Sequence, residues 1–104
     1  MLKTIKQILG LTQDEPVIGS IELWAGYSSR VPELYARCEG QSMRIQDNPA
    51  LYSLIGITYG GDGREHFNLP DYRPRDAKGN PQPWDPAKSP VVLICIRGMY
   101  PQMD

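Results

Sequence analysis

The sequence predicts a small α+β domain that is mainly β, with short helices, hairpins and much irregular loop. Its 104 residues suffice for one domain with a modest core. Ten glycines and ten prolines make up about a fifth of the chain, well above the usual share, without the period of collagen. Apolar residues alternate with polar ones over short stretches only, as they do in strands. These observations together favour short elements joined by many turns.

The charge balance excludes two classes of partner. With 11 basic and 12 acidic side chains the net charge is −1, so the chain has no excess of positive charge with which to bind nucleic acid or an anionic membrane. No apolar run approaches the ~20 residues that cross a bilayer, and the N-terminus mixes polar with apolar residues, unlike a secretory signal. We therefore expect no nucleic-acid binding, no membrane insertion, and synthesis in the cytosol without Sec-dependent export.

An amphipathic helix is expected over residues 2–9, ended by Gly10. Its apolar stripe consists of Leu2, Ile5, Ile8 and Leu9. Because two helical turns are marginal in water on their own, this helix either packs on its own domain or serves as an arm for oligomerisation or attachment. We assign residues 1–15 to the helix and a polar linker, and residues 16–104 to the main domain.

A strand is predicted over residues 17–25, followed by a loop. Its better-buried side is expected to carry Val17, Gly19, Ile21, Leu23 and Ala25. Residues 34–38 and 43–45 alternate again and are predicted to form a hairpin that turns at Gly40 and Gln41.

The unbroken apolar run 91–96 predicts a strand that is buried on both faces. Cys95 lies in this run and Cys38 in the earlier strand, and their spacing is not that of a zinc site. Both cysteines are therefore expected to be small buried hydrophobes.

A second helix is expected to begin at Pro49, with Asn48 as its N-cap, and to be closed by Gly56. Its apolar stripe consists of Leu51, Leu54 and Ile55. This helix sets the direction in which the next loop emerges.

The stretch from Tyr59 to Asp71 is predicted to be a loop that holds a shape. Glycines permit a positive φ, Phe67 and Leu69 alternate toward the core, and Pro70 stops the alternation. The two aspartates are expected to accept hydrogen bonds from nearby backbone N–H groups. The residues assigned to this loop are Tyr59, Gly60, Gly61, Asp62, Gly63, Phe67, Leu69, Pro70 and Asp71.

The sequence lacks the combinations of residues that common catalytic and metal-binding sites require. A phosphate-binding loop requires a lysine followed by serine or threonine after its glycines, and none follows here. Asp62, Glu65 and Asp71 could act on a glycoside, but turn formation explains the aspartates more simply. The single histidine, His66, allows a catalytic arrangement only if it is itself the base, and Cys38 would then have to be exposed, contrary to its place in a strand. His66 could contribute to a metal site only if a homo-oligomer gathered several copies. We expect no enzyme activity, cofactor or resident metal.

Residues 72–86 are polar and rich in proline, which predicts an extended surface excursion. Trp84 is its only large apolar side chain, so we expect it to anchor the excursion to the body. The alternative is a role in binding, in which exposed Tyr27, Tyr72 and Trp84 stack on the sugars of a host receptor.

Several motifs occur together in one order. They are GSIELWAG at 19–26, Pro32, CEGQ at 38–41, NPALYSLIGITYGGDG at 48–63, FNLPD at 67–71 and ICIRGMYP at 94–101. In this order and spacing the chain resembles the phage tail collar domain, a family found in phage tail fibres and in bacterial microcystin-dependent proteins. The resemblance spans residues 17–75 and resumes in the last strand.

The resemblance implies a structural unit of a phage tail fibre, tail tip or baseplate, located in the virion and assembled in the host cytoplasm. It implies a homo-oligomer, a trimer above all, that contacts other tail or baseplate proteins. It supplies no catalytic residues. Where family members commonly continue with an arginine-glycine-arginine run, this chain has Tyr72-Arg73-Pro74-Arg75, and no long receptor-binding extension follows.

Overall fold

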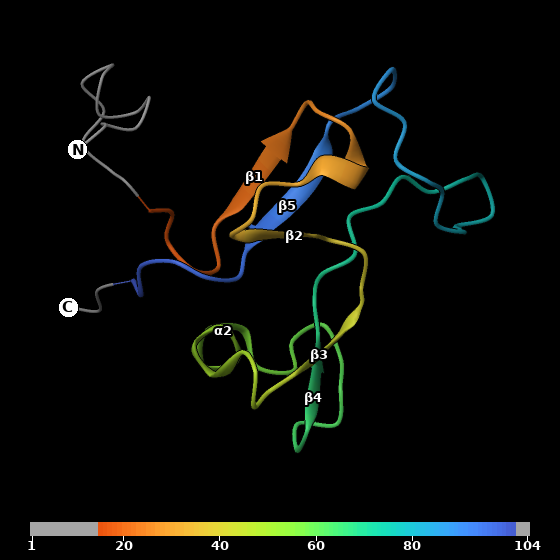
Figure 1. The fold of residues 1–104 in the computed structure, drawn as a ribbon. Coiled ribbons are helices and arrows are strands. Elements are labelled where there is room, and N and C mark those ends of the chain that lie inside the picture. The colour runs from red at the N-terminus through yellow and green to blue at the C-terminus, as the bar shows by residue number, and fades with distance from the viewer. Residues whose placement is uncertain (1–14, 102–104) are drawn as a thin grey trace, which may run out of the picture.

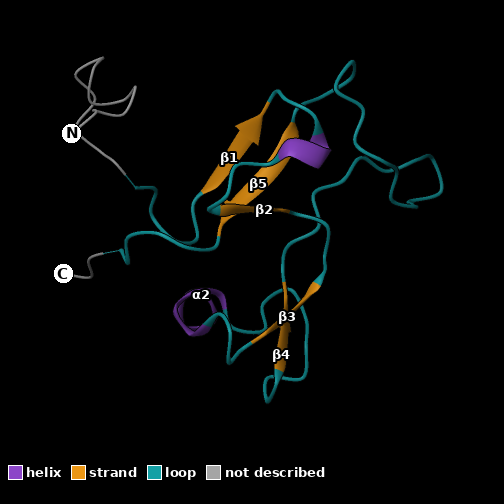
Figure 2. Ribbon diagram, in the orientation of Figure 1, coloured by secondary structure: helices purple, strands orange, loops and turns teal. Residues whose placement is uncertain are grey.

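The computed structural model describes residues 15–101 as a mainly β domain with one short helix (Figure 1). Its elements are β1 (Ile21–Trp24), the 3-10 helix η1 (Ser28–Arg30), β2 (Tyr35–Arg37), β3 (Ser42–Arg44), α2 (Pro49–Ile55), β4 (His66–Asn68) and β5 (Val91–Cys95). The strands form two small antiparallel sheets, and long irregular segments connect them (Figure 2). The predicted fold class is confirmed. The expected helix over residues 2–9 lies outside the described residues.

The larger sheet has the order β1-β5-β2, so the last strand of the chain lies in its centre (Figure 1). Ile94 faces Ile21 on one side and Ala36 on the other. Four of the five residues of β5 are buried, as the apolar run predicted. β1 is shorter than predicted, because Val17 forms a bridge with Met99 instead of continuing the strand.

The predicted hairpin of residues 34–38 and 43–45 is wrong. β2 and β3 both exist, but β2 pairs with β5 and β3 pairs with β4 in the second sheet. Between them Gly40 has φ +71° and donates its N–H to Pro70 O at 3.1 Å, which leads the chain from one sheet to the other. Pairing with β4 places Met43 opposite Phe67, whose side chain is fully buried, whereas Tyr35 and Ala36 of β2 are only partly buried against the core.

α2 has the predicted bounds, with Pro49 in its first turn and Gly56 at its end. Gly56 adopts φ +54° and donates its N–H to Tyr52 O at 2.8 Å. The predicted capping bond of Asn48 is absent, because its side-chain amide turns back and donates to Arg44 O at 3.1 Å. The buried Asn48 Oδ1 has no hydrogen-bond partner among the described residues. Within residues 15–101 no helix has the length and apolarity needed to cross a bilayer.

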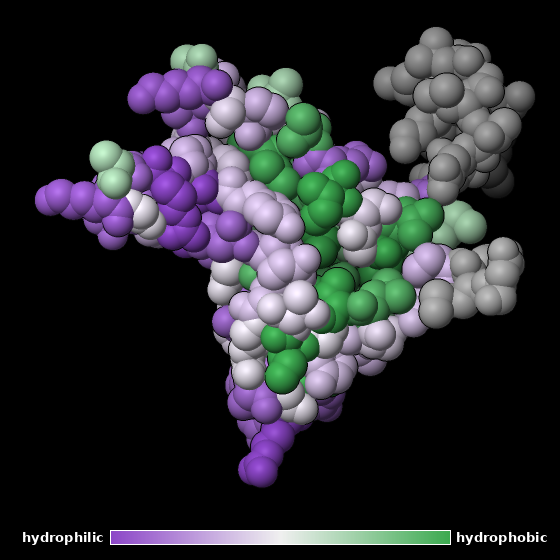
Figure 3. Space-filling model, turned by 180° about the vertical axis from the view of Figure 1, so that it is seen from behind, coloured by the Kyte–Doolittle hydropathy of each residue, from purple (hydrophilic) through white to green (hydrophobic). Residues whose placement is uncertain are grey.

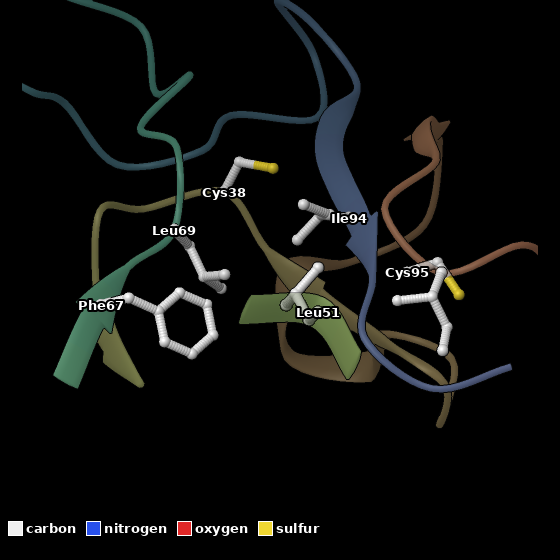
Figure 4. Packing of buried hydrophobic residues seen from close by; sticks show 7 residues of the cluster. Cys38, Leu51, Phe67, Leu69, Ile94 and Cys95 are labelled. Carbon is white, nitrogen blue, oxygen red and sulfur yellow. The ribbon is translucent and has the colours of Figure 1, made fainter. Parts of the chain in front are cut away.

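One core joins the two sheets and the helix (Figure 4). Its buried members are Ile18, Cys38, Leu51, Phe67, Leu69, Ile94 and Cys95. The Tyr52 ring packs on the Phe67 ring with centroids 5.3 Å apart, in a tilted arrangement that adds to the gain from burial. Both cysteines are completely buried and free, as predicted, and burial raises the pKa of Cys38 to about 12.

The expectation that one side of β1 is well buried is wrong for the strand itself. Ile21 is 46% exposed and Leu23 is 69% exposed. Ile94 lies on the same face of the sheet but is 1% exposed, because it points into the core beside Leu51 (Figure 4). The core therefore covers β5 and leaves the neighbouring edge strand open. Figure 3 shows a band of apolar surface on the face of the domain that is seen from behind.

Candidate functional site

The loop between α2 and β4 depends on glycine conformations that other residues resist. Gly60, Gly61 and Gly63 have φ of +117°, +108° and +71°. A Cβ atom on Gly61 would lie 2.5 Å from Phe67 Cα and 2.7 Å from His66 O, so the loop packs directly on the backbone of β4. Asn68 N donates to Gly60 O at 3.0 Å, and Gly63 N donates to His66 O at 3.0 Å. The loop and the strand thus form one bonded unit.

The side chain of Asp62 stabilises this loop through hydrogen bonds to its backbone. Its Oδ1 accepts hydrogen bonds from the backbone N–H groups of Arg64, Glu65 and His66 at 2.8, 2.9 and 3.0 Å. These bonds, above all that from His66, hold the pKa of the carboxyl well below its usual range. The predicted role of Asp62 as a turn former is confirmed.

Asp71 holds the end of the loop through two arginines. Its Oδ1 accepts from the backbone N and the Nε of Arg73 at 3.1 and 3.0 Å, and its Oδ2 accepts from the second guanidinium nitrogen at 2.7 Å. Arg75 approaches Oδ2 to 3.2 Å. The bidentate contact with Arg73 is the main reason that the pKa of Asp71 is lowered to about 2. Sequence reasoning assigned the turn to Asp71 but missed both arginines, although they follow it at a spacing of two and four residues.

Trp84 ties the excursion to the body, as predicted. Its Nε1 donates to Glu39 Oε2 at 2.6 Å, and Arg37 Nε lies 3.3 Å from the other oxygen of the same carboxylate. Glu39 in turn bridges to Asp71 through the backbone. The excursion is therefore fixed at its start by Asp71 and near its end by Trp84. The contact between Glu39 and Trp84 could not be predicted from the sequence, because the two residues are 45 positions apart and no local pattern relates them.

The family model of the Phage Tail Collar Domain matches residues 19–77, more than half of the chain. The chain belongs to the phage tail collar domain family. The match includes β1, α2, the glycine loop and Asp71, and it ends before most of the excursion and before β5. A search of curated proteins finds no match. Collar domains are structural domains of phage tails and not a known enzyme family, so membership implies association with the phage tail and the virion.

The carboxylates of this collar domain are arranged for holding a shape. A glycoside hydrolase needs one carboxyl whose pKa is raised so that it can donate a proton. Asp62 and Asp71 instead have lowered pKa values. Asp62 accepts from backbone N–H groups of its own loop, and Asp71 accepts from the backbone and guanidinium groups of Arg73. Cys38 is a buried thiol with a raised pKa, which disfavours the reactive thiolate. Over the described range, no three of the His, Cys, Asp and Glu side chains gather as metal ligands would.

The three candidate receptor residues do not form one site in the collar domain. Tyr27 is 69% exposed beside η1, and its carbonyl accepts from Trp24 Nε1 at 3.0 Å. Tyr72 is 46% exposed, and the neighbouring Tyr59 hydroxyl raises its pKa. Trp84 is half-buried and lines a hollow of the excursion to which neither tyrosine contributes. Whether these side chains contact a receptor stays a prediction.

The collar domain also presents the open face of β1 described above. Because β1 is an edge strand, the backbone groups on its outer side are also free of sheet partners within the described chain. Apolar side chains and an unpaired edge thus lie together at one border of the larger sheet. Sequence reasoning identified Ile21 and Leu23 as one face, but it placed that face inside the domain.

Proposed function

We propose that the chain is an assembly module of a phage tail, a structural component of the tail fibre, tail tip or baseplate. Its membership of the collar family supports a structural role in the tail. The glycine loop also supports this proposal, because its polar groups are hydrogen-bonded within the loop and to β4. Such a loop can keep its conformation when other proteins bind beside it. The proposed partners are further copies of the chain and other tail or baseplate proteins.

The open face of β1 is the observation that carries this proposal. Leu23 and Ile21 are two positions apart in β1, so their side chains lie on the same face of the strand, and they are 69% and 46% exposed. Large apolar side chains grouped on the surface of a small domain favour protein–protein contact. The net charge of −1 leaves little repulsion between like copies, so a second copy is the occupant that we infer for this face.

A homotrimer is the proposed state, since tail fibres commonly have threefold symmetry and a closed ring of copies leaves no open interface. The apolar stripe of the N-terminal segment would add to the contact between copies or attach the ring to the tail. This stripe consists of Leu2, Ile5, Ile8 and Leu9, which lie outside the described residues.

Light scattering of the purified full chain at micromolar concentration tests this proposal. We expect a mass three times that of one chain for the wild type. Leu23→Glu should have a single-chain mass and still melt in one cooperative transition, as a folded monomer does. Glu22→Gln is the matched control, because this exposed neighbour points to the opposite face of β1. A wild-type chain that is monomeric would overturn self-association, and a trimeric Leu23→Glu chain would show that copies meet elsewhere. Ile5→Glu with Ile8→Glu tests the N-terminal stripe in the same way.

A further inference from the structure

The excursion between Asp71 and β5 lines a partly open hollow of about 660 Å³. Its polar and aromatic lining includes Arg75, Asp76, Gln82, Trp84, Asp85 and Lys88. This volume lies within the roughly 300 to 1,000 Å³ of pockets that hold small organic molecules. The excursion lies on the side of the domain away from α2 (Figure 1), and its surface is hydrophilic, in contrast to the apolar band (Figure 3).

The walls of the hollow are held in place by the chain itself. Trp84 is fixed through its Nε1 by Glu39 at 2.6 Å. Arg75 lies 3.2 Å from Asp71 Oδ2 and donates to Gly79 O at 3.2 Å. Across the hollow, the backbone of Gln82 donates to Pro74 O at 2.8 Å. Little conformational entropy would be lost when a ligand enters walls that are already ordered.

The chemistry of the lining indicates the class of ligand. Arg75 and Lys88 balance Asp76 and Asp85, so the hollow offers no net positive charge to a phosphate or a nucleic acid. An indole ring provides an apolar surface beside these groups. The Nε2 of Gln82 already donates to Asp76 Oδ2 at 3.3 Å, so Gln82 offers its Oε1 as an acceptor, Asp85 offers a carboxylate and Lys88 offers an ammonium donor. A sugar ring combines an apolar C–H face with an edge of hydroxyl groups, which fits this combination.

We propose that this hollow is a binding site for an uncharged saccharide, with the sugar ring packed on Trp84 and its hydroxyls bonded by Gln82, Asp85 and Lys88. These four residues lie beyond residue 77, where the collar match ends, so the site is an addition to the matched part of the fold. Since none of them belongs to the open face of β1, saccharide binding and self-association are separate properties that can fail separately.

The chain contains two tryptophans, which allows a test with an internal reference. The full-length protein labelled with 5-fluorotryptophan gives one fluorine NMR signal from Trp84 and one from Trp24, assigned with Trp84→Phe and Trp24→Phe. The probes are glucose, galactose, N-acetylglucosamine and short oligosaccharides of each, with inorganic phosphate as the anionic comparison. At least one saccharide is expected to shift the Trp84 signal saturably and leave the Trp24 signal in place.

Gln82→Ala and Lys88→Ala are each expected to weaken that binding about tenfold, the effect of one lost hydrogen bond to a polar ligand. Lys78→Ala is the matched control, because this exposed lysine lies in the same excursion but does not line the hollow. An unmoved Trp84 signal with every saccharide up to about 100 mM would overturn the proposal. So would a saturable response to phosphate alone, or equal saccharide binding by all three variants.

Discussion

Replacing Gly61 by alanine tests whether the glycine loop determines the stability of the domain. At φ +108° any side chain costs about 1 to 2 kcal/mol of backbone strain. The added Cβ would also lie 2.5 Å from Phe67 Cα, which is backbone and cannot rotate away. Either the loop or β4 must shift, and such overpacking adds about 1 to 3 kcal/mol. We expect Gly61→Ala to lower the free energy of unfolding by about 2 to 5 kcal/mol.

Gly79→Ala is a matched control for that substitution. Gly79 has φ +86°, but nothing lies within 4 Å of the position of its Cβ. It therefore carries the strain without the steric contact and should cost only about 1 to 2 kcal/mol. Urea unfolding followed by circular dichroism, at one protein concentration for all variants, measures both values. Equal losses in the two variants would refute the inference that the loop is packed against β4.

Two further predictions concern the core and the end of the loop. Phe67→Ala should lower the free energy of unfolding by about 3 to 5 kcal/mol, because Phe67 is fully buried against Tyr52, and a loss below about 1 kcal/mol in urea unfolding would contradict this. The pKa of Asp71 is lowered from 3.8 to about 2 in the folded chain, so its stabilising effect is complete above the unfolded pKa and is lost as the pH falls toward 2. Asp71→Asn should therefore be less stable than wild type at pH 6 and approach it at pH 2, and an unchanged difference between the two pH values would count against the pairing with Arg73.

Local signals in the sequence were sufficient for the elements that depend on neighbouring residues. The apolar run of β5, the Pro49 start and Gly56 end of α2, and the burial of Phe67 and Leu69 were all predicted. Each follows from side-chain size, backbone freedom or the missing N–H of proline, which act within a few positions along the chain.

Pairing between distant segments could not be predicted in the same way. Alternation shows which residues of β1 share a face, but only the placement of α2 and β4 decides that this face stays open at Leu23. The partner of β2 is a strand more than 50 residues away, and a nearby return strand suggested a hairpin instead. Likewise, the bond of Asn48 to Arg44 O replaced the expected cap because the preceding turn brings that carbonyl within reach.

The candidate site was predicted in part. Asp62 was identified correctly because its three donors lie two to four residues ahead in the chain. Glu39 was missed as the partner of Trp84, since a contact across 45 positions depends on the finished fold. The hollow of the excursion was missed for the same reason, although its tryptophan had been singled out.

The amount of this protein in purified virions of its parent phage tests the central claim most directly. Quantitative mass spectrometry should find the wild-type and Glu22→Gln chains in the particles at equal levels. It should find little of the Leu23→Glu chain, because a carboxylate then replaces an apolar side chain on the open face of β1. Absence of the wild-type chain from purified particles would contradict a structural role in the tail. Normal incorporation of Leu23→Glu would contradict assembly through the face of β1.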